Sequence, residues 1–296
     1  MGCYSSSPQR YEDSPQLDTL CEGYDIFSFR QFQAKGDRKS KLEKLRSYSM
    51  DYISLPISDI PDQISKALLI CVNDYPNNEH SWNNGSINDA IYAANSLRKY
   101  DFQIYSFLSP PAAQFLGYFR TFLQRTTEYL TILFIGPISD TPVSNNSDLS
   151  SNSLCFKDNL INCSTFTDYL MKFKKNSLKA LFLFDSIHIN TDTPLYDFFS
   201  GENCRLIYLT GQKLEPGLLS FNFWRYFVDH PSMTPNDLKN FMKEELARFQ
   251  IDISIKGFSP EEEELSIFPE CTPLESSTSH SSVEPEVLQL KPLTYN

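Results

Sequence analysis

Five short apolar runs, separated by longer polar or amphipathic segments, constrain the fold of this chain more than any other feature. They occupy residues 66–72, 102–108, 130–136, 178–184 and 204–210. Apolar runs of this length with polar residues at both ends are typical of strands buried on both faces of a parallel sheet. The chain is therefore expected to build a sheet whose two faces are both covered.

The segments between and after these runs supply the covering helices. Residues 87–100, 113–126 and 164–175 carry apolar side chains at the spacing of one helical face. Residues 234–249 begin with Thr-Pro, and proline fits the first position of a helix. Strands that alternate with helices in this order predict an α/β domain, with a mostly parallel sheet and helices on both faces.

Composition divides the chain into three regions. Residues 1–63 show no sustained strand or helix period, and we expect them to form a flexible N-terminal region. Residues 64–256 hold all five apolar runs and form the expected domain. Residues 257–296 are rich in Glu, Ser and Pro and cannot bury enough apolar surface to offset chain entropy. We therefore expect a disordered acidic tail.

Charge and cysteine usage exclude several classes of protein. The net charge of −11 argues against nucleic-acid binding, although residues 260–296, with eight Glu and one Lys, contribute −7 of it. The seven cysteines form no CxxC pair and the four histidines stand apart, so neither a disulfide framework nor a zinc site is expected. No run reaches the ~18 apolar residues of a membrane-spanning helix. The N-terminus has no apolar signal peptide, so a cytoplasmic protein is expected.

Short motifs stand at the ends of the predicted strands. GSINDA at residues 85–90 opens the helix after the first strand. The third strand runs into GPIS at 136–139, and the fourth ends in DSIHIN at 185–190. LTGQ at 209–212 and FNFW at 221–224 follow downstream. The carboxyl ends of parallel strands meet at one sheet edge, which is where α/β proteins place their sites.

The order and spacing of these motifs resemble the caspase/metacaspase family of cysteine peptidases, over roughly residues 64–250. In that family a histidine after the third strand is the general base, and a cysteine after the fourth is the nucleophile. The matching positions here are Ile138 and Ile187, which offer neither function. No histidine lies between His80 and His188, and no cysteine lies between 163 and 204, so a shifted alignment restores neither group. The resemblance therefore implies a diverged metacaspase relative that is a pseudopeptidase.

The same resemblance places Asp89 and Asp185 in a pocket for the basic side chain of a peptide. Two carboxylates can bind such a side chain by charge-assisted hydrogen bonds. The alternative is that Asp185 accepts from backbone donors at a strand end and Asp89 lies on a solvated helix turn. Two neighbouring positions depart from the family, because Ser86 replaces cysteine and Gly136 replaces serine.

No cofactor is expected, and calcium activation, known in many metacaspases, is not expected either. Calcium needs several oxygen ligands that converge on one point. The relevant stretch offers only Asp140, Asp148 and Asp158, which are widely spaced among Ser and Asn.

The N-terminus, Met-Gly-Cys-Tyr-Ser-Ser, matches the myristoylation pattern, with Gly2 as the acceptor, and Cys3 is a candidate for palmitoylation. One myristoyl chain binds membranes only marginally, so a second signal is required. Cys3 and a basic cluster within residues 35–46 are the two candidates. A chance match to this short pattern is the alternative.

The leading hypothesis is a catalytically inactive protein, lipid-anchored at the cytoplasmic face of a membrane, that binds or regulates a protein or peptide partner such as an active metacaspase. The alternative is an active caspase-clan endopeptidase with Arg/Lys specificity, or an unconventional hydrolase that uses Ser186 or Cys163 with His188. A third possibility is an unrelated doubly wound domain. Against a nucleotide-binding version, the turn at residues 73–76 has neither a GxGxxG motif nor a P-loop.

Overall fold

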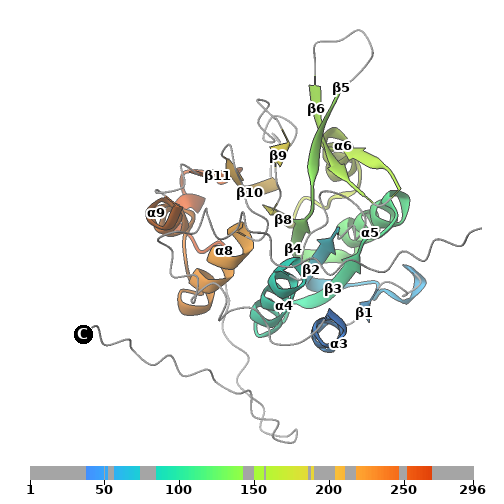
Figure 1. Ribbon diagram of the computed structural model, residues 1–296, viewed down its shortest axis with the longest axis horizontal. Helices are drawn as coiled ribbons and strands as arrows, with labels where there is room; N and C mark the ends of the chain where they lie inside the picture. The colour runs from blue at the N-terminus through green and yellow to red at the C-terminus, as the bar shows by residue number, and fades with distance from the viewer. Residues whose placement is uncertain are drawn as a thin grey trace, which may run out of the picture.

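A seven-stranded sheet runs through the centre of the protein (Figure 1). The computed structural model describes residues 38–49, 51–52, 57–73, 85–142, 150–156, 158–185, 188–189, 204–210, 218–246 and 252–268. In spatial order the strands are β1 (Asp51–Tyr52), β3 (Gln103–Leu108), β2 (Ile64–Val72), β4 (Thr126–Ile135), β8 (Lys179–Asp185), β10 (Cys204–Thr210) and β11 (Asp252–Lys256). All neighbours are parallel except β10 and β11, which are antiparallel.

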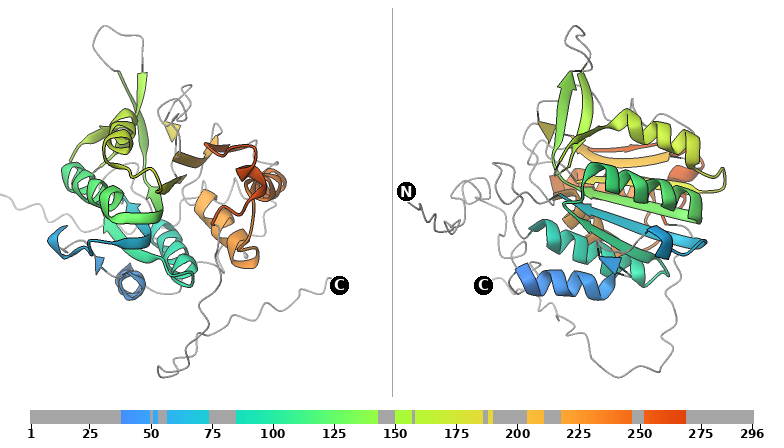
Figure 2. Two further views of the ribbon diagram at one scale, coloured as in Figure 1. Left: turned by 180° about the vertical axis from the view of Figure 1, so that it is seen from behind. Right: turned by 90° about the vertical axis from the view of Figure 1, so that its right-hand side faces the viewer.

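Helices cover both faces of this sheet (Figure 2). One face packs against α3 (Arg38–Tyr48), α4 (Gly85–Arg98), α8 (Leu218–Asp229) and α9 (Pro235–Leu246). The other face packs against α5 (Ala112–Arg125) and α6 (Cys163–Phe173). The mostly parallel α/β architecture that the sequence predicts is therefore confirmed, with its five central strands at the five apolar runs.

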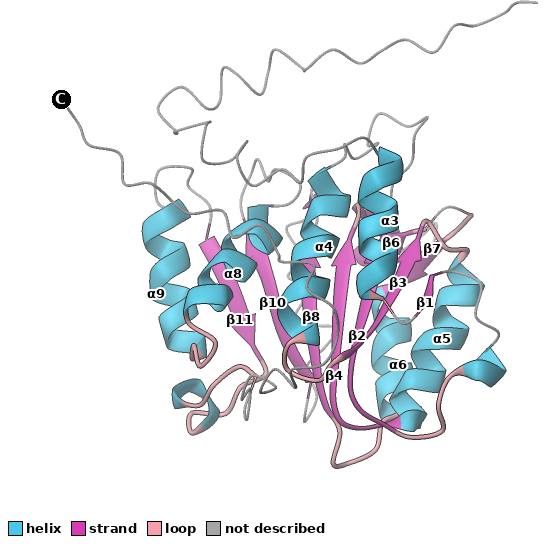
Figure 3. Ribbon diagram, turned by 90° about the horizontal axis from the view of Figure 1, so that it is seen from below, coloured by secondary structure: helices cyan, strands magenta, loops and turns pink. Residues whose placement is uncertain are grey.

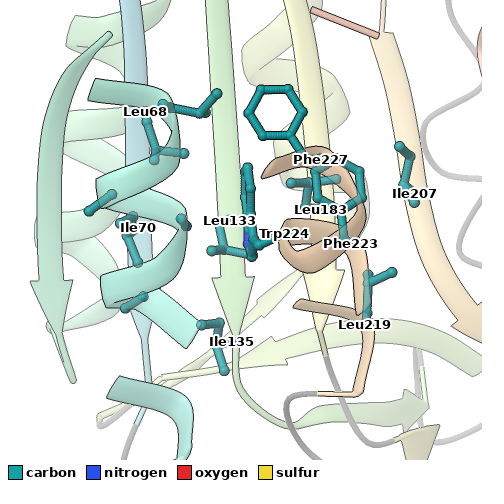
Figure 4. Packing of buried hydrophobic residues seen from close by; sticks show 14 of the residues in the cluster. Leu68, Ile70, Leu133, Ile135, Leu183, Ile207, Leu219, Phe223, Trp224 and Phe227 are labelled. Carbon is teal, nitrogen blue, oxygen red and sulfur yellow. The ribbon is translucent and has the colours of Figure 1, made fainter. Parts of the chain in front are cut away.

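The strands separate two apolar cores by the alternation of their side chains. On β2, Leu68 and Ile70 face the α4 and α8 side, whereas Leu69 and Cys71 face the α5 and α6 side. Neighbouring residues of a strand point to opposite faces, so a continuous apolar run supplies both cores. Figure 4 shows how α8 packs its apolar face against the strands of the first core through Leu219, Phe223, Trp224 and Phe227.

A second, smaller sheet stands at the carboxyl edge of the central one (Figure 3). Its strands, in spatial order, are β7 (Leu160–Asn162), β6 (Ser150–Cys155), β5 (Ile138–Pro142) and β9 (His188–Ile189). None of the five apolar runs lies within residues 137–153, so the sequence did not predict β5 or β6. Strands rich in Ser and Asn lack the apolar alternation by which a strand is detected.

Asn73 ties the two sheets together immediately after β2. Its backbone N–H donates to the carbonyl oxygen of Ile135 at 2.8 Å, which continues the ladder between β2 and β4. Its side-chain amide donates to the carbonyl oxygen of Cys155 at 2.6 Å. A fully buried amide that satisfies two strand ends holds the base of the small sheet against the carboxyl edge of the large one.

The domain extends past both predicted boundaries. On the N-terminal side, α3 packs on α4 and buries Leu45, and β1 pairs with β3, although residues 1–63 were expected to be flexible. On the C-terminal side, residues 257–268, which we call the strap, are packed on the domain, although the sequence assigns them to a disordered tail. Both predictions were wrong for these residues.

Polar and aromatic contacts hold the strap. The Arg205 guanidinium on β10 forms an ion pair with Glu262 and lies over the Phe258 ring. Phe268 is buried among aromatic rings, so its burial outweighs the acidic composition around it. The rings within contact of Phe268 belong to Phe102, Phe223, Trp224 and Phe227.

Candidate functional site

The carboxyl edge of the central sheet brings together the two aspartates that the sequence singles out. Asp185 is the last residue of β8, and Asp89 lies near the start of α4. The backbone N–H of Ser220, in the first turn of α8, donates to Asp185 Oδ2 at 3.0 Å. A helix N-terminus favours a nearby negative charge, so this bond stabilises the Asp185 carboxylate.

Burial sets the electrostatics of this pair. Asp89 and Asp185 are only 6% and 2% exposed. Burial, and secondly the negative charge of Asp185, raise the pKa of Asp89 well above its ordinary value. Two neighbouring buried carboxyl groups resist double ionisation unless a cation joins them. Burial and the charge of Asp89 also raise the pKa of Tyr92, one turn along α4.

Three further buried oxygens accompany the pair. Ser86 Oγ, Asn88 Oδ1 and Ser220 Oγ have no hydrogen-bond partner within the described part of the chain. Each such atom costs about 1–3 kcal/mol if it stays unpaired. All three can accept hydrogen bonds, as the carboxylates do. We call Ser86, Asn88, Asp89, Asp185 and Ser220 the carboxyl site, and it suits a positively charged group with several N–H donors.

The alternative for Asp185 was that its carboxylate accepts from backbone donors at a strand end, and it does accept one such hydrogen bond, from Ser220. The alternative for Asp89, a solvated helix turn, is wrong, because Asp89 is buried. Sequence reasoning missed Ser220 as a member of the site. Its signal was weak, since a serine next to the start of a helix is common.

Ile138, at the position that the resemblance assigns to the general base, lies in the core. It is 0% exposed and belongs to the apolar cluster on the α5 and α6 side, with Leu154, Phe156 and Phe184. In the backbone register Ile138 pairs with His188 of β9. Ile187 and Ser186 lie outside the described residues.

Gly136 lies where a side chain has little room. A β-carbon at this position would lie 3.0 Å from the Asn73 Cβ and 3.0 Å from the Phe134 ring. The Gly136 N–H also bonds to the carbonyl oxygen of Asp185 at 3.3 Å, so the backbone cannot easily withdraw. A serine here would push against the residue that ties the two sheets together.

The described cysteines are poor nucleophiles. Cys163 is 0% exposed, and burial, with a smaller contribution from Cys155, raises the pKa of its thiol. Burial also raises the pKa of Cys155 to about 11, that of Cys204 to about 12, and that of Cys71 well above its ordinary value. A thiol reacts as its thiolate, so all four are disfavoured at neutral pH.

Asp158, one of the three aspartates weighed as calcium ligands, has a structural contact instead. Its Oδ1 accepts a hydrogen bond from the backbone N–H of Ala112, at 2.7 Å, and so caps the start of α5. Asp148 lies outside the described residues, and the side chain of Asp140 is not described. The parts of the chain that the structure describes contain no group of three or more His, Cys, Asp or Glu side chains placed to hold a metal ion.

The lipidation candidates Gly2 and Cys3 lie outside the described residues. The basic cluster lies partly on α3, where Lys41 is only 5% exposed beside the buried Leu45. Within the described residues, no helix is both long and apolar enough to cross a membrane.

Comparisons with known proteins agree with this architecture. Residues 64–206 match the family model described as the caspase domain. Protein GSU0716 from Geobacter sulfurreducens is structurally similar, with 12% identity, a TM-score of 0.53, and coverage of 71% of this chain and 100% of that one. The Drosophila initiator caspase Dronc aligns with a TM-score of 0.45 and 15% identity, over 70% of this chain and 87% of that one. No curated protein matches the sequence. Residues 64–206 are thus similar to the caspase domain, and the comparisons support a caspase/metacaspase-like family.

Proposed function

We propose that this caspase-like protein binds the basic side chain of a protein or peptide partner at the carboxyl site and does not cut it. The observation that carries the proposal is the buried pair Asp89 and Asp185, with three nearby buried oxygens that have no hydrogen-bond partner among the described residues. An Arg or Lys side chain would neutralise the pair and supply the missing donors. The partner would be a basic protein or peptide, for example an exposed segment of an active metacaspase.

The absence of cleavage rests on the residues available for chemistry. Acyl transfer by this family's route needs a nucleophile and a base within hydrogen-bond reach. Isoleucine occupies both matching positions, 138 and 187, and Ile138 packs in the apolar core. The described thiols have raised pKa values, and the unconventional nucleophile Cys163 is fully buried. These features favour binding over the alternative of an active endopeptidase.

A lipid anchor at the N-terminus would place this binding at the cytoplasmic face of a membrane. The support is the sequence pattern at Gly2, with Cys3 beside it for a second acyl chain. Two chains hold a protein on a membrane far longer than one, because each buried methylene adds to the affinity.

Peptide titration tests the proposal directly. A fluorescent peptide with a central Arg should bind the full chain, and the same peptide with citrulline, the neutral isostere, should bind at least tenfold more weakly. Asp185→Asn should reduce Arg-peptide binding by a similar factor, because a buried charge pair is broken. Asp168→Asn, at an exposed position on α6, serves as the matched control and should bind normally.

Mass spectrometry of the same mixtures separates binding from cleavage. The peptide should remain intact with and without calcium. Equal affinity for the Arg and citrulline peptides would contradict the binding site. Peptide turnover that Ser186→Ala or Cys163→Ala abolishes would establish the hydrolase alternative.

A further inference from the structure

One corner of the domain, at the end of α6, combines an exposed apolar side chain with several cations. Met171, in the last turn of α6, is 75% exposed, the highest value among the large apolar side chains that the structure describes. Leu265 follows at 56% and Val228 at 54%. A single exposed apolar residue is common on protein surfaces, so Met171 suggests a binding surface only together with the residues around it.

Two cations are held at this corner by one aromatic ring. The Arg120 guanidinium of α5 lies 4.6 Å from the centre of the Phe173 ring. The Lys172 ammonium lies 5.4 Å from the same ring. Phe173 is half-buried and stacks edge-on against Tyr169, so it forms a fixed platform. Cation–π contacts hold both charges at the Phe173 ring, two residues after Met171.

The turn after α6 adds a third exposed cation. Lys175 is exposed, whereas the Lys174 ammonium turns back to donate to the carbonyl oxygens of Lys175 and Leu178, at 3.2 and 2.8 Å. Lys174 thereby fixes the turn on which Lys175 stands. Asp168, one turn earlier on α6, is the acidic residue nearest in sequence. We call Arg120, Met171, Lys172, Phe173 and Lys175 the Met171 corner.

This corner differs from the basic cluster that the sequence nominates as a membrane signal. On α3, Lys41 is largely buried and Glu43 is exposed between Lys39 and Lys44. One lysine of α3 is therefore buried by packing, and the charge of the glutamate partly neutralises the two exposed lysines beside it. At the Met171 corner, by contrast, Arg120, Lys172 and Lys175 are all exposed, and one acid, Asp168, lies a turn before Lys172.

We propose that the Met171 corner contacts an anionic lipid surface, with Met171 entering the headgroup region and Arg120, Lys172 and Lys175 lying among the headgroups. Lys and Arg stems bury along apolar surface while their charges stay in water, which suits this depth. Each cation near an anionic leaflet contributes about fivefold in affinity. The contact does not depend on acylation at Gly2 or on peptide binding at the carboxyl site.

Co-sedimentation with vesicles tests this contact. The full chain, purified without acylation, should sediment with vesicles of phosphatidylserine and phosphatidylcholine and remain in solution with phosphatidylcholine alone. The double variant Lys172→Glu/Lys175→Glu should lose at least about tenfold in affinity. Met171→Ser should weaken binding with an unchanged salt dependence, because it removes apolar contact and no charge. Lys39→Glu/Lys44→Glu on α3 is the matched control and should bind normally.

All substituted side chains in these variants are exposed, and circular dichroism checks that each variant is folded. Absence of sedimentation with phosphatidylserine vesicles would overturn the proposal. An equal loss of vesicle affinity in the α3 control would also overturn it. So would a result in which the chain binds an acidic protein saturably but does not bind vesicles. Because the purified chain carries no acyl group, each of these outcomes leaves the proposed anchor at Gly2 as it was.

Discussion

Asp89 is a residue whose ionisation works against the fold. Its ordinary pKa is 3.8, and burial, then the Asp185 charge, raise the pKa in the folded protein. The folded state therefore holds the proton more tightly than the unfolded chain does. This contribution to stability is complete below the unfolded pKa and is lost as pH rises through the folded pKa. At neutral pH an Asp89 carboxylate is thus a source of instability unless a cation joins it.

Asp89→Asn should consequently stabilise the unliganded protein at pH 7, by about 1–2 kcal/mol, because a neutral amide replaces a disfavoured buried carboxylate. The gain should vanish well below pH 3.8, the ordinary pKa, where Asp89 is protonated in both states. Thermal melts across this pH range measure it, with exposed Asp168→Asn as the control. A gain of equal size at both ends of the range would contradict the assignment.

Gly136→Ser should destabilise the fold by about 1–3 kcal/mol, since its Cβ meets Asn73 and Phe134 at 3.0 Å. Gly117→Ala is the contrasting case, because its nearest neighbour, Ile57 Cδ1, stands at 3.4 Å and the residue lies within α5. Alanine there should be neutral or stabilising by up to about 1 kcal/mol. Urea denaturation of both variants measures their free energies of unfolding. Equal losses of stability in the two variants would show that lack of space at Gly136 does not cause the destabilisation.

At the scale of elements, the strap shows how a short apolar pair can order an acidic segment. Ile267 and Phe268 follow a run of glutamates, yet both are buried. The Phe268 ring contacts Phe102, the residue before β3, and Phe227 on α8. Because α8 also carries Ser220, the helix that holds the strap is the one that holds Asp185.

Phe268→Ala should cost about 3–5 kcal/mol, since it empties a socket lined by aromatic rings. Leu265→Ala, three residues earlier and 56% exposed, should change the free energy of unfolding by less than about 0.5 kcal/mol. Chemical denaturation measures both. A small loss for Phe268→Ala would mean that the strap contributes little to the folded domain.

The sequence predicts elements where apolar periodicity is strong and misses them where composition dilutes it. The five central strands are confirmed because each run supplies two cores. Thr234 and Asp237 cap α9 reciprocally, as the Thr-Pro start indicates. The strap is missed because averaging over residues 257–296 hides Ile267 and Phe268. Asp89 and Asp185 are found through motif order, whereas Ser220 depends on where α8 docks, which no local pattern encodes.

At the scale of the whole molecule, the carboxyl site and the Met171 corner belong to different ends of the sheet. The carboxyl site lies where β8 ends, and the Met171 corner lies just before β8 begins. A domain that rested on lipid through the corner would hold the carboxyl site away from the bilayer. A partner could then reach the site from solution.

The proposed anchor is tested in cells by Gly2→Ala, which removes the acceptor for the acyl chain. This variant should move the protein from the membrane fraction to the soluble fraction, and Cys3→Ser should shift it only in part. Cell fractionation with immunoblotting measures both. An unchanged distribution for Gly2→Ala would rule out myristoylation as the anchor.

Ile138 shows how core packing limits the side chains that one position can carry. Its side chain fills space in the core on the α5 and α6 side. A histidine at this position would set a polar ring among Leu154, Phe156 and Phe184, and burial without partners disfavours such a ring. Replacing Ile138 by histidine would therefore destabilise the fold. Packing alone selects against a titratable side chain at this position, whatever chemistry the surrounding residues could perform.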